Sequence, residues 1–362
     1  VLTKALLPLP EKWHGLSDVE IRYRKRYLDL IANPEVKAIF RKRSLILTTI
    51  RNFFDEEGFM EVETPILQPL AGGASAKPFI THHNALDIDL YLRIAPELYL
   101  KRLIVGGFEK VYEIARCFRN EGISFQHNPE FTQVEFYWAY ATYEDLMQLT
   151  EKLIMRLVSK LTDGQNVIER DGVKIHFQTP FPRLKFFDLF KDKTGVDLEL
   201  AENEADLRKA LKERGVAVPI DGVLGYAEII DEVYKVLIRP NIIQPAFVID
   251  YPTALIPLAK RKDADPNKIA STQLIVQGME ITKAYNELND PLDQETRFQE
   301  EESKKGKGVE EAQATDADFI EALKHGLPPT AGFGMGIDRL ASLLIGTHSI
   351  KEVILFPTLR PE

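Results

Sequence analysis

The sequence predicts an α+β fold, and three observations support this prediction. Residues 34–57 carry apolar side chains at helical spacing between a proline and a glycine, which is typical of a long amphipathic helix. Two β-rich runs, 111–119 and 131–140, flank a polar segment in the pattern of an antiparallel hairpin. A glycine-rich run at 332–336 leads into an apolar segment, as a strand that turns into a buried helix would.

The N-terminal part of the chain is predicted to change from linker to helix near residue 34. Residues 1–33 contain Pro8, Pro10 and a charged, aromatic segment, and they are expected to form a lead-in or linker. Asn33 offers an N-cap for the long helix that follows. A short strand is expected from Phe59 to Pro65, where proline closes it.

The hairpin predicted at 110–140 has one chemically distinctive face. Side chains of a strand alternate between its two faces, so residues two apart lie together. One face of the first strand carries Glu113, Ala115, Cys117 and Arg119, and one face of the second carries Phe131, Gln133, Glu135 and Tyr137. Charged and aromatic side chains are therefore expected to share a surface.

The remaining elements are expected to be scaffold. Residues 144–161 and 202–237 are predicted to be helices from their apolar spacing, with short strands between Gly172 and Phe187. Residues 292–325 form a charged and helical stretch, in which Lys304–Gly308 is expected to be the least ordered part.

Composition excludes several classes of protein. At 362 residues with 44% hydrophobic side chains, the chain can bury a large core. No stretch approaches the roughly 18 apolar residues of a membrane helix, and the first residues lack the pattern of a signal peptide, so a cytoplasmic protein is expected. Cys117 is the only cysteine, which excludes an intrachain disulfide and a thiolate zinc cluster. A net charge of −9 argues against a general polyanion binder, so any RNA contact must be local.

Three separated segments resemble the signature motifs of class II aminoacyl-tRNA synthetases. They lie at about 34–65, 110–140 and 332–345. The sequences that carry the resemblance are Gly58-Phe59-Met60-Glu61-Val62-Glu63-Thr64-Pro65 after the long helix, Phe118-Arg119-Asn120-Glu121-Gly122 with His127-Asn128-Pro129-Glu130-Phe131-Thr132, and Gly334-Met335-Gly336-Ile337-Asp338-Arg339. The third motif is not a phosphate-binding P-loop, because no Gly-Lys-Ser/Thr follows it. Their order along the chain makes the resemblance specific.

Within that class, the chain resembles the lysine-specific enzymes over nearly its whole length. The segments concerned are Gly72-Gly73-Ala74-Ser75-Ala76-Lys77-Pro78-Phe79, Leu92-Arg93-Ile94-Ala95-Pro96-Glu97-Leu98-Tyr99, Tyr285-Asn286-Glu287-Leu288-Asn289-Asp290 and Leu355-Phe356-Pro357. The resemblance implies a class II catalytic domain at 34–362, with a mostly antiparallel sheet flanked by helices and a homodimer formed through 34–65. The lysine enzymes usually carry an N-terminal anticodon-binding barrel, for which this chain has no room. Adenylation without efficient discrimination among tRNAs is therefore expected.

The resemblance also implies the residues that bind ATP. Arg119 and Arg339 are the expected catalytic residues, Arg119 on the α-phosphate and the substrate carboxylate, and Arg339 on the distal phosphates of a bent ATP. Two anions must approach each other in this reaction, so fixed guanidinium groups suit it. By the same resemblance, Phe131 stacks on adenine with Arg339 on the opposite face, Glu121 accepts from the adenine amino group, and His127 lies near the phosphates.

Lysine carries an ammonium at each end, so its pocket needs carboxylates in two places. The resemblance assigns Glu97 to the α-ammonium, with close backbone approach at Gly73. Glu287 and Tyr137 are expected at the ε-ammonium, with Glu135 nearby. Strand alternation places Lys283, Tyr285 and Glu287 on one shared face, as in a pocket wall.

A magnesium ion is expected to bridge the ATP phosphates through a few oxygen ligands. Glu280 matches one metal carboxylate of the family, but the second position is Gln273, a neutral residue. Glu280 also has the opposite strand parity to Glu287, so a bulge or turn between them is predicted. Two further departures are Lys283, where the family commonly has asparagine, and Ile256, where it commonly has serine.

The expected function is ATP-dependent activation of L-lysine and its transfer to tRNA(Lys). Two alternatives stay open at this point. One is a related enzyme that attaches lysine or a lysine analogue to a protein, motivated by the missing barrel and by Lys283. The other is a non-catalytic paralogue that serves as a regulatory or RNA-binding subunit, motivated by Gln273.

Overall fold

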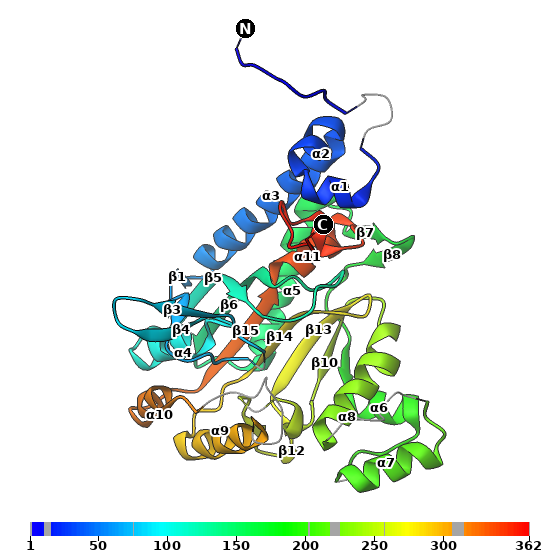
Figure 1. Ribbon diagram of the computed structural model, residues 1–362. Coiled ribbons are helices and arrows are strands. Elements are labelled where there is room, and N and C mark those ends of the chain that lie inside the picture. The colour runs from blue at the N-terminus through cyan, green and yellow to red at the C-terminus, as the bar shows by residue number, and fades with distance from the viewer. Residues whose placement is uncertain are drawn as a thin grey trace.

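An eight-stranded sheet forms the centre of the molecule (Figure 1). The computed structural model describes residues 2–10, 16–74, 76–201, 203–217, 225–256, 258–305 and 315–361. In spatial order the strands are β1 (Met60–Glu61), β5 (Lys110–Phe118), β6 (Glu130–Ala139), β15 (Thr330–Gly336), β14 (Met279–Asn286), β13 (Ser271–Val276), β10 (Ala246–Ile249) and β9 (Arg183–Lys185). Only the two outer pairs, β1 with β5 and β9 with β10, run parallel. The expected α+β fold with a mostly antiparallel sheet is confirmed.

Three helices cover one face of this sheet. They are α3 (Pro34–Glu56), α5 (Tyr143–Leu161) and α11 (Ile337–Ile345), and they contact one another as well as β6, β14 and β15. Their apolar stripes pack on inward-facing strand residues such as Phe136 and Phe333, which are almost fully buried. A capping box in which Thr142 and Asp145 exchange hydrogen bonds begins α5.

A second apolar cluster lies on the opposite face. It is formed by α4 (Glu97–Val105), α6 (Phe186–Thr194), α7 (Glu204–Glu213), α8 (Tyr226–Val233) and α10 (Ala317–Lys324) together with strand residues such as Tyr137 and Tyr285. Figure 1 shows α6, α7 and α8 beside the β10 edge, with α9 (Pro291–Lys305) and α10 below the ends of the central strands. Helix α6 was not predicted, because Phe186 was assigned to the end of a strand region.

Several smaller elements complete the described chain. Three small sheets pair β2 (Leu67–Gln68) and β3 (Ile80–His83) with β4 (Ile88–Leu92), β7 (Val167–Arg170) with β8 (Val173–His176), and β11 (Arg261–Lys262) with β12 (Asp265–Ile269). Short helical turns lie at Tyr234–Ile238, Arg239–Asn241, Thr253–Leu255 and Ile350–Glu352.

Some predicted boundaries differ from the structure. The strand expected from Phe59 to Pro65 is reduced to β1, because only Met60 and Glu61 pair with β5. The region 202–237 contains α7 and α8 rather than one helix, and part of it lies outside the described residues. The prediction for Lys304–Gly308 concerns a segment that also extends beyond the described residues.

The end of the expected lead-in is folded against the C-terminal segment. Residues 19–32 form two short helices, α1 (Val19–Arg24) and α2 (Arg26–Ala32). The Arg26 guanidinium is buried, pairs with Asp29 at 2.6 Å, and donates to the carbonyl oxygens of Lys351 and Leu355 at 2.9 and 3.1 Å. This tertiary contact stabilises a segment that local composition alone suggested to be a linker.

The described residues include no helix with the length and apolar character needed to cross a membrane.

Candidate active site

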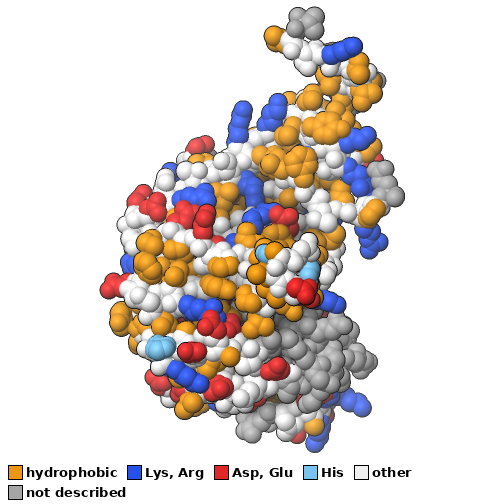
Figure 2. Space-filling view, turned by 60° about the vertical axis from the view of Figure 1, so that its left-hand side comes forward, with side chains coloured by type: hydrophobic (Ala, Val, Ile, Leu, Met, Phe, Trp, Pro, Cys, Tyr) orange, Lys and Arg blue, Asp and Glu red, His pale blue; other side chains and the backbone are white. Residues whose placement is uncertain are grey.

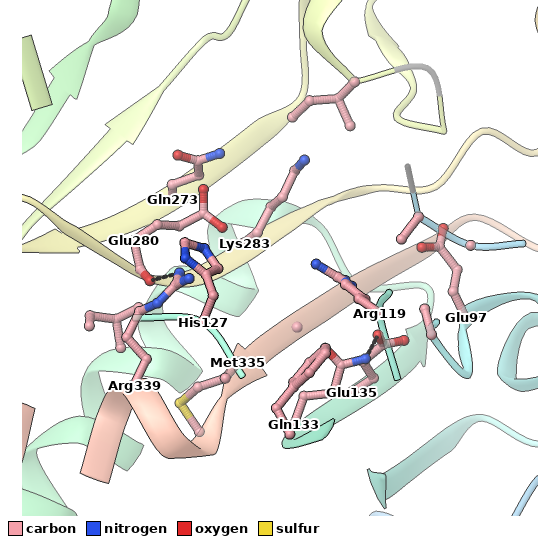
Figure 3. Close-up of a pocket in the computed structure, with 18 of the residues that line it drawn as sticks. Glu97, Arg119, His127, Gln133, Glu135, Gln273, Glu280, Lys283, Met335 and Arg339 are labelled. Carbon is pink, nitrogen blue, oxygen red and sulfur yellow. Dashed lines mark hydrogen bonds between the residues drawn. The ribbon is translucent and has the colours of Figure 1, made fainter. Parts of the chain in front are cut away.

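A cavity of about 700 Å³ opens on the sheet face that carries Tyr137 and Tyr285. Its lining residues come from β6, β13, β14, β15, α4, α8 and α11 and from the loop between β5 and β6, which are distant in the sequence. Figure 3 shows Arg339 and His127 on one side, Glu97 on the other and Arg119 between them. Arg119 and Arg339, the two expected catalytic residues, therefore share one cavity.

Strand β6 and the loop that joins it to β5 supply part of the wall of this cavity. Cross-strand pairs join Glu113 to Glu135, and Cys117 to Phe131, which confirms that the predicted faces coincide. Gln133, Glu135 and Tyr137 all line the cavity. Burial raises the pKa of the Cys117 thiol to about 12, so this cysteine is no nucleophile.

A bulge in β14 brings residues of opposite parity to the cavity. Leu274 pairs with Thr282, but the next residue, Ile275, pairs with Glu280, so Ile281 is the extra residue. Glu280 and Lys283 consequently both line the cavity. The irregularity that strand parity predicted between Glu280 and Glu287 is confirmed.

One buried carboxylate connects the three motif segments. Asp338, at the start of α11, accepts a hydrogen bond from the backbone N–H of Thr132 on β6 at 2.9 Å. It also pairs with Arg43 of α3 at 2.6 Å. The ion pair between Asp338 and Arg43 is largely shielded from water, so it keeps a defined geometry. Asp338 therefore fixes the position of α11 relative to α3 and β6. Arg339 is the next residue, so its position depends on this link.

One end of the cavity is rich in cations. Arg339 donates to the Glu280 backbone carbonyl at 2.8 Å, which aims its guanidinium toward Glu280 and Lys283 (Figure 3). The cationic side chains that line the cavity are Arg119, Lys235, Arg239, Lys283 and Arg339. Burial, followed by Arg339 and Arg119, lowers the pKa of His127, so its imidazole is neutral at pH 7. Such a cluster suits a polyphosphate.

The residues expected around adenine lie at this end as well. Glu121, His127 and Phe131 line the cavity. The Arg119 guanidinium lies 5.0 Å from the centroid of the Phe131 ring. One face of this ring is therefore already covered by a cation.

Two oxygen donors lie near the cationic end. Glu280 and Gln273 line the cavity, and Lys283 is the cross-strand neighbour of Gln273. The Gln273 amide oxygen accepts from the Tyr251 hydroxyl at 2.7 Å, which orients the amide. The described residues contain no group of three or more His, Cys, Asp or Glu side chains arranged for a metal ion. This donor set fits Mg²⁺ that is held mainly by phosphates and water, not a cation held by a protein cage.

The other end of the cavity is acidic and buried. Glu97 and Glu135 are 5% and 7% exposed and line the cavity. Glu97 accepts from the Tyr285 hydroxyl at 3.0 Å, and Glu135 accepts from the Gln133 amide at 2.7 Å. Burial and the neighbouring Glu97 raise the pKa of Glu135 well above its usual range.

Glu287 lies just behind the cavity wall rather than on its surface. Its side chain is 1% exposed and pairs with Lys101, a buried residue of α4 that also donates to Glu97 at 2.6 Å. Burial raises the pKa of Glu287, and Glu97 adds to this effect, while Lys101 opposes it. The other predicted lysine-binding residues line the cavity, whereas Glu287 lies behind residues that line it.

Two glycines make close approach possible at this end. Gly73 has φ +83°, and a Cβ there would lie 3.0 Å from the Glu97 Cβ. A Cβ at Gly332 would lie 2.0 Å from Glu287 Oε1 and 2.6 Å from a Tyr137 ring carbon. Gly332 lines the cavity, so Glu287 Oε1 sits directly behind a gap in the wall.

Sequence reasoning missed Lys101, Lys235, Arg239 and Tyr251. Lys101 follows Glu97 by four residues on a helix, and this spacing is a recognisable signal for an ion pair. Lys235 lies in the segment 202–237, which was expected to be scaffold, and Arg239 and Tyr251 lie outside the predicted elements, so no sequence signal connects these three to the motifs.

The whole arrangement accommodates a ligand with an anionic part and a cationic part. Polyphosphate matches the cationic end, and a small molecule with positively charged groups matches the acidic end. Arg119 lies between the two ends (Figure 3). A reaction that joins a carboxylate of the small molecule to a phosphate would take place there.

Comparison with known proteins agrees with this geometry. Residues 18–360 match the family described as class II tRNA synthetases (D, K and N). The chain is 52% identical to the lysine–tRNA ligase of Pelotomaculum thermopropionicum over 361 residues, which is 100% of this chain and 71% of that protein. It is also 52% identical to the lysine–tRNA ligases of Carboxydothermus hydrogenoformans and Helicobacter pylori strain P12, of which it covers 73% and 71%.

Proposed function

Because the chain belongs to the class II tRNA synthetases of the D, K and N group, we propose that it is a lysine–tRNA ligase. It activates L-lysine with ATP and transfers the lysyl group to tRNA(Lys). The observation that carries the proposal is the pairing of a cationic end with a buried acidic end in one cavity. Among aspartate, asparagine and lysine, only lysine brings a positive side chain to those carboxylates, and a neutral side chain would leave them without a partner.

In the first step, a carboxylate oxygen of lysine attacks the α-phosphorus of ATP. The bond to the β-phosphate bridging oxygen breaks, and pyrophosphate leaves. Both reactants are anionic, so the step needs fixed cations where charge accumulates. Arg119 takes the α-phosphate and the lysine carboxylate, and Arg339 takes the distal phosphates. Their shared cavity supports these roles.

In the second step, a terminal ribose hydroxyl of tRNA(Lys) attacks the carbonyl carbon of the adenylate. AMP leaves, and the lysyl group forms an ester with the tRNA. The cations that held the α-phosphate in the first step also stabilise the AMP that departs.

The lysine pocket is assigned to the acidic end of the cavity. Glu97 binds the α-ammonium, beside the close backbone approach at Gly73. Glu287 and Tyr137 take the ε-ammonium, with Glu135 and Tyr285 next to them. The gap at Gly332 supports this assignment, because it leaves Glu287 Oε1 without a covering side chain. Lys283 lines the cavity and is the candidate partner for an anionic group of either substrate.

The adenine site is assigned to the three remaining residues. Phe131 stacks on the base, Glu121 accepts from the adenine amino group, and His127 contacts the phosphates as a neutral imidazole. The N–H of a neutral imidazole can donate a hydrogen bond to a phosphate oxygen without adding positive charge. The Arg119 guanidinium over Phe131 supports an adenine position on the open face of the ring.

Glu280 and Gln273 would hold Mg²⁺ together with the phosphates. When bound, the ion neutralises phosphate charge and orients the leaving pyrophosphate. Replacing a carboxylate by an amide weakens such a site without removing its oxygen donor, so Gln273 does not argue against catalysis.

The assembly is proposed to be a homodimer through 34–65, within a catalytic unit that extends from residue 34 to 362. Exposed apolar side chains on and near this segment support an interface, namely Leu45, Met60, Ile66 and Leu67. Figure 2 shows several groups of hydrophobic side chains on one face of the molecule. A sedimentation experiment that finds only monomer at micromolar concentration would exclude it. The site of action of such a ligase is the cytoplasm, where tRNA is charged.

The proposal is tested by exchange of labelled pyrophosphate into ATP. Exchange should require L-lysine and should not occur with L-aspartate or L-asparagine. Formation of lysyl-tRNA from unmodified tRNA(Lys), by this chain or by the full-length protein that contains it, then tests the second step. Folded protein without lysine-dependent exchange contradicts the proposal, and exchange followed by transfer to a protein but not to tRNA would favour the protein-modifying alternative.

A further inference from the structure

Lys101 is a buried ammonium that joins two of the pocket carboxylates. Its side chain is 0% exposed and lies one helical turn after Glu97 on α4. It donates to Glu97 Oε1 at 2.6 Å and pairs with Glu287, whose chain position is 186 residues away (287 − 101). No substrate group is needed to explain this bridge, because it is complete in the chain itself.

The surroundings of Lys101 exclude water. The rings of Tyr137, Tyr285 and Phe319 have centroids 5.9, 6.0 and 5.9 Å from its Nζ. These rings come from β6, β14 and α10, so three elements enclose the ammonium. Burial disfavours the charged form, but Glu287 and Glu97 outweigh it, and the pKa of Lys101 is raised. Lys101 therefore stays an ammonium over the physiological range.

The charges at this end of the cavity can be balanced against the proposed substrate. Counted in their ionised forms, the buried side chains of Glu97, Glu135 and Glu287 carry three negative charges, and Lys101, which pairs with Glu97 and Glu287, supplies one positive charge. Two negative charges are left over. Lysine brings two ammonium groups, and Arg119 faces its carboxylate. The pocket with Lys101 is therefore matched to an amino acid with two ammonium groups, and without Lys101 it would hold one carboxylate too many.

We propose that Lys101 is a specificity-determining positioning residue, which holds the side chains of Glu97 and Glu287 at a fixed separation so that they select a diammonium amino acid. This inference rests on the proposed lysine activation. Without the bridge, the buried Glu287 carboxyl loses its ammonium partner and takes up a proton more readily, since a desolvated unpaired charge is costly. A protonated acid no longer demands an ammonium partner. Such a pocket binds lysine less well and rejects a neutral tail less strongly.

The test replaces Lys101 by methionine, which keeps the length of the side chain without its charge. Pyrophosphate exchange is measured with L-lysine and with L-norleucine, whose four-carbon tail lacks the ammonium. In Lys101→Met, the KM for lysine should rise at least tenfold near pH 7, and the preference for lysine over norleucine should fall at least tenfold. The KM for ATP should stay within about twofold. The increase in the KM for lysine should become smaller as the pH rises toward 9, because Glu287 then loses the added proton.

Lys110→Met is the matched control. Lys110 also lies against aromatic rings, with Nζ 4.4 Å from the Trp138 centroid, but it is only partly buried and donates to the Glu57 backbone carbonyl instead of a pocket carboxylate. This variant should leave the KM for lysine and the lysine preference unchanged. A Lys101→Met enzyme with unchanged KM for lysine, or with a loss of kcat that is equal at every pH, would overturn the inference.

A second variant, Lys101→Arg, covers the case in which Lys101→Met does not fold. It keeps a cation beside Glu97 and Glu287 but replaces the single Nζ that contacts both carboxylates with a larger planar group. The KM for lysine should rise at least tenfold while the KM for ATP stays within about twofold, and an unchanged KM for lysine overturns the inference. If the unaltered protein shows no lysine-dependent exchange at all, it is the proposed function that fails; exchange without these effects contradicts only the role of Lys101.

Discussion

The two faces of strand β6 lie in opposite environments, one apolar and one polar. One face carries Val134 and Phe136, which lie in the apolar cluster under α3, α5 and α11. The other carries Gln133, Glu135 and Tyr137, which line the cavity. Adjacent residues thus differ completely in environment, because side chains alternate along a strand. One strand both stabilises the fold and builds the site.

The apolar face is packed by aromatic contacts. Phe136 stacks on Phe333 with ring centroids 4.6 Å apart and meets Phe59 at 5.0 Å. On the cavity face, three carboxylates are held in a buried setting, where desolvation raises the pKa of Glu135 and Glu287. Those raised pKa values mean that the empty site destabilises the fold at neutral pH. The apolar face must therefore supply the stability that the cavity face loses.

The largest effect is expected from a substitution on the apolar face of β6. Phe136→Ala removes a buried ring and leaves a cavity, so it should lower the free energy of unfolding by about 3–5 kcal/mol. The KM values for lysine and ATP should change little at a temperature where the variant stays folded. Denaturant unfolding measures the loss, and Phe108→Ala, at a side chain that is 42% exposed, is the control. A similar loss in both variants would contradict the contrast between the faces.

The next largest effect is expected from a substitution in the cavity that leaves the apolar core unchanged. Arg119→Ala should lower kcat/KM for pyrophosphate exchange by about 10² to 10³, because a preorganised cation on the reacting groups is lost. Its melting temperature should stay within a few degrees. Arg116→Ala serves as the control, since Arg116 lies three residues earlier, on β5, but pairs with Glu130 on the outer surface. Equal losses of exchange in both variants would show that strand position, not the cavity, is responsible.

A smaller effect is expected at Gly332, where the wall is thinnest. Gly332→Ala places a methyl group where Glu287 Oε1 and the Tyr137 ring now lie. Both must shift, so the KM for lysine should rise by about ten- to a hundredfold, or roughly 1.4–2.8 kcal/mol. The KM for ATP is the internal control. An unchanged KM for lysine would place the ε-ammonium elsewhere.

The smallest effect is a dependence on pH that only the cavity face should show. Burial raises the pKa of Glu287 in the free protein, and an ammonium ligand favours its carboxylate form. Lysine binding therefore releases a proton, and affinity must fall as the pH drops below the raised pKa. From about pH 8 to about pH 6.5 the KM for lysine should rise by up to about tenfold for each pH unit. The KM for ATP in the same buffers should not follow this rise, and a flat KM for lysine would contradict the pKa assignment.

Local rules predicted much of this molecule correctly. The long helix, the hairpin faces and the β15–α11 transition follow from periodicity and caps, which depend only on neighbouring residues. The bulge near Ile281 was also predictable, because Glu280 and Glu287 have opposite parity on a regular strand. Lys101 could have been found from its spacing to Glu97.

Other features depend on contacts between distant segments. Composition suggested a linker at residues 19–32, but Arg26 finds carbonyl partners more than 300 positions away. Lys235 and Arg239 join the cavity only because α8 packs beside the sheet. Local sequence is enough to predict which residues alternate along a strand, cap a helix or pair with a near neighbour. Which carboxylates are buried together, and which lysine bridges them, depends on the packing of separate elements, because burial and charge balance arise when those elements exclude water from the same place.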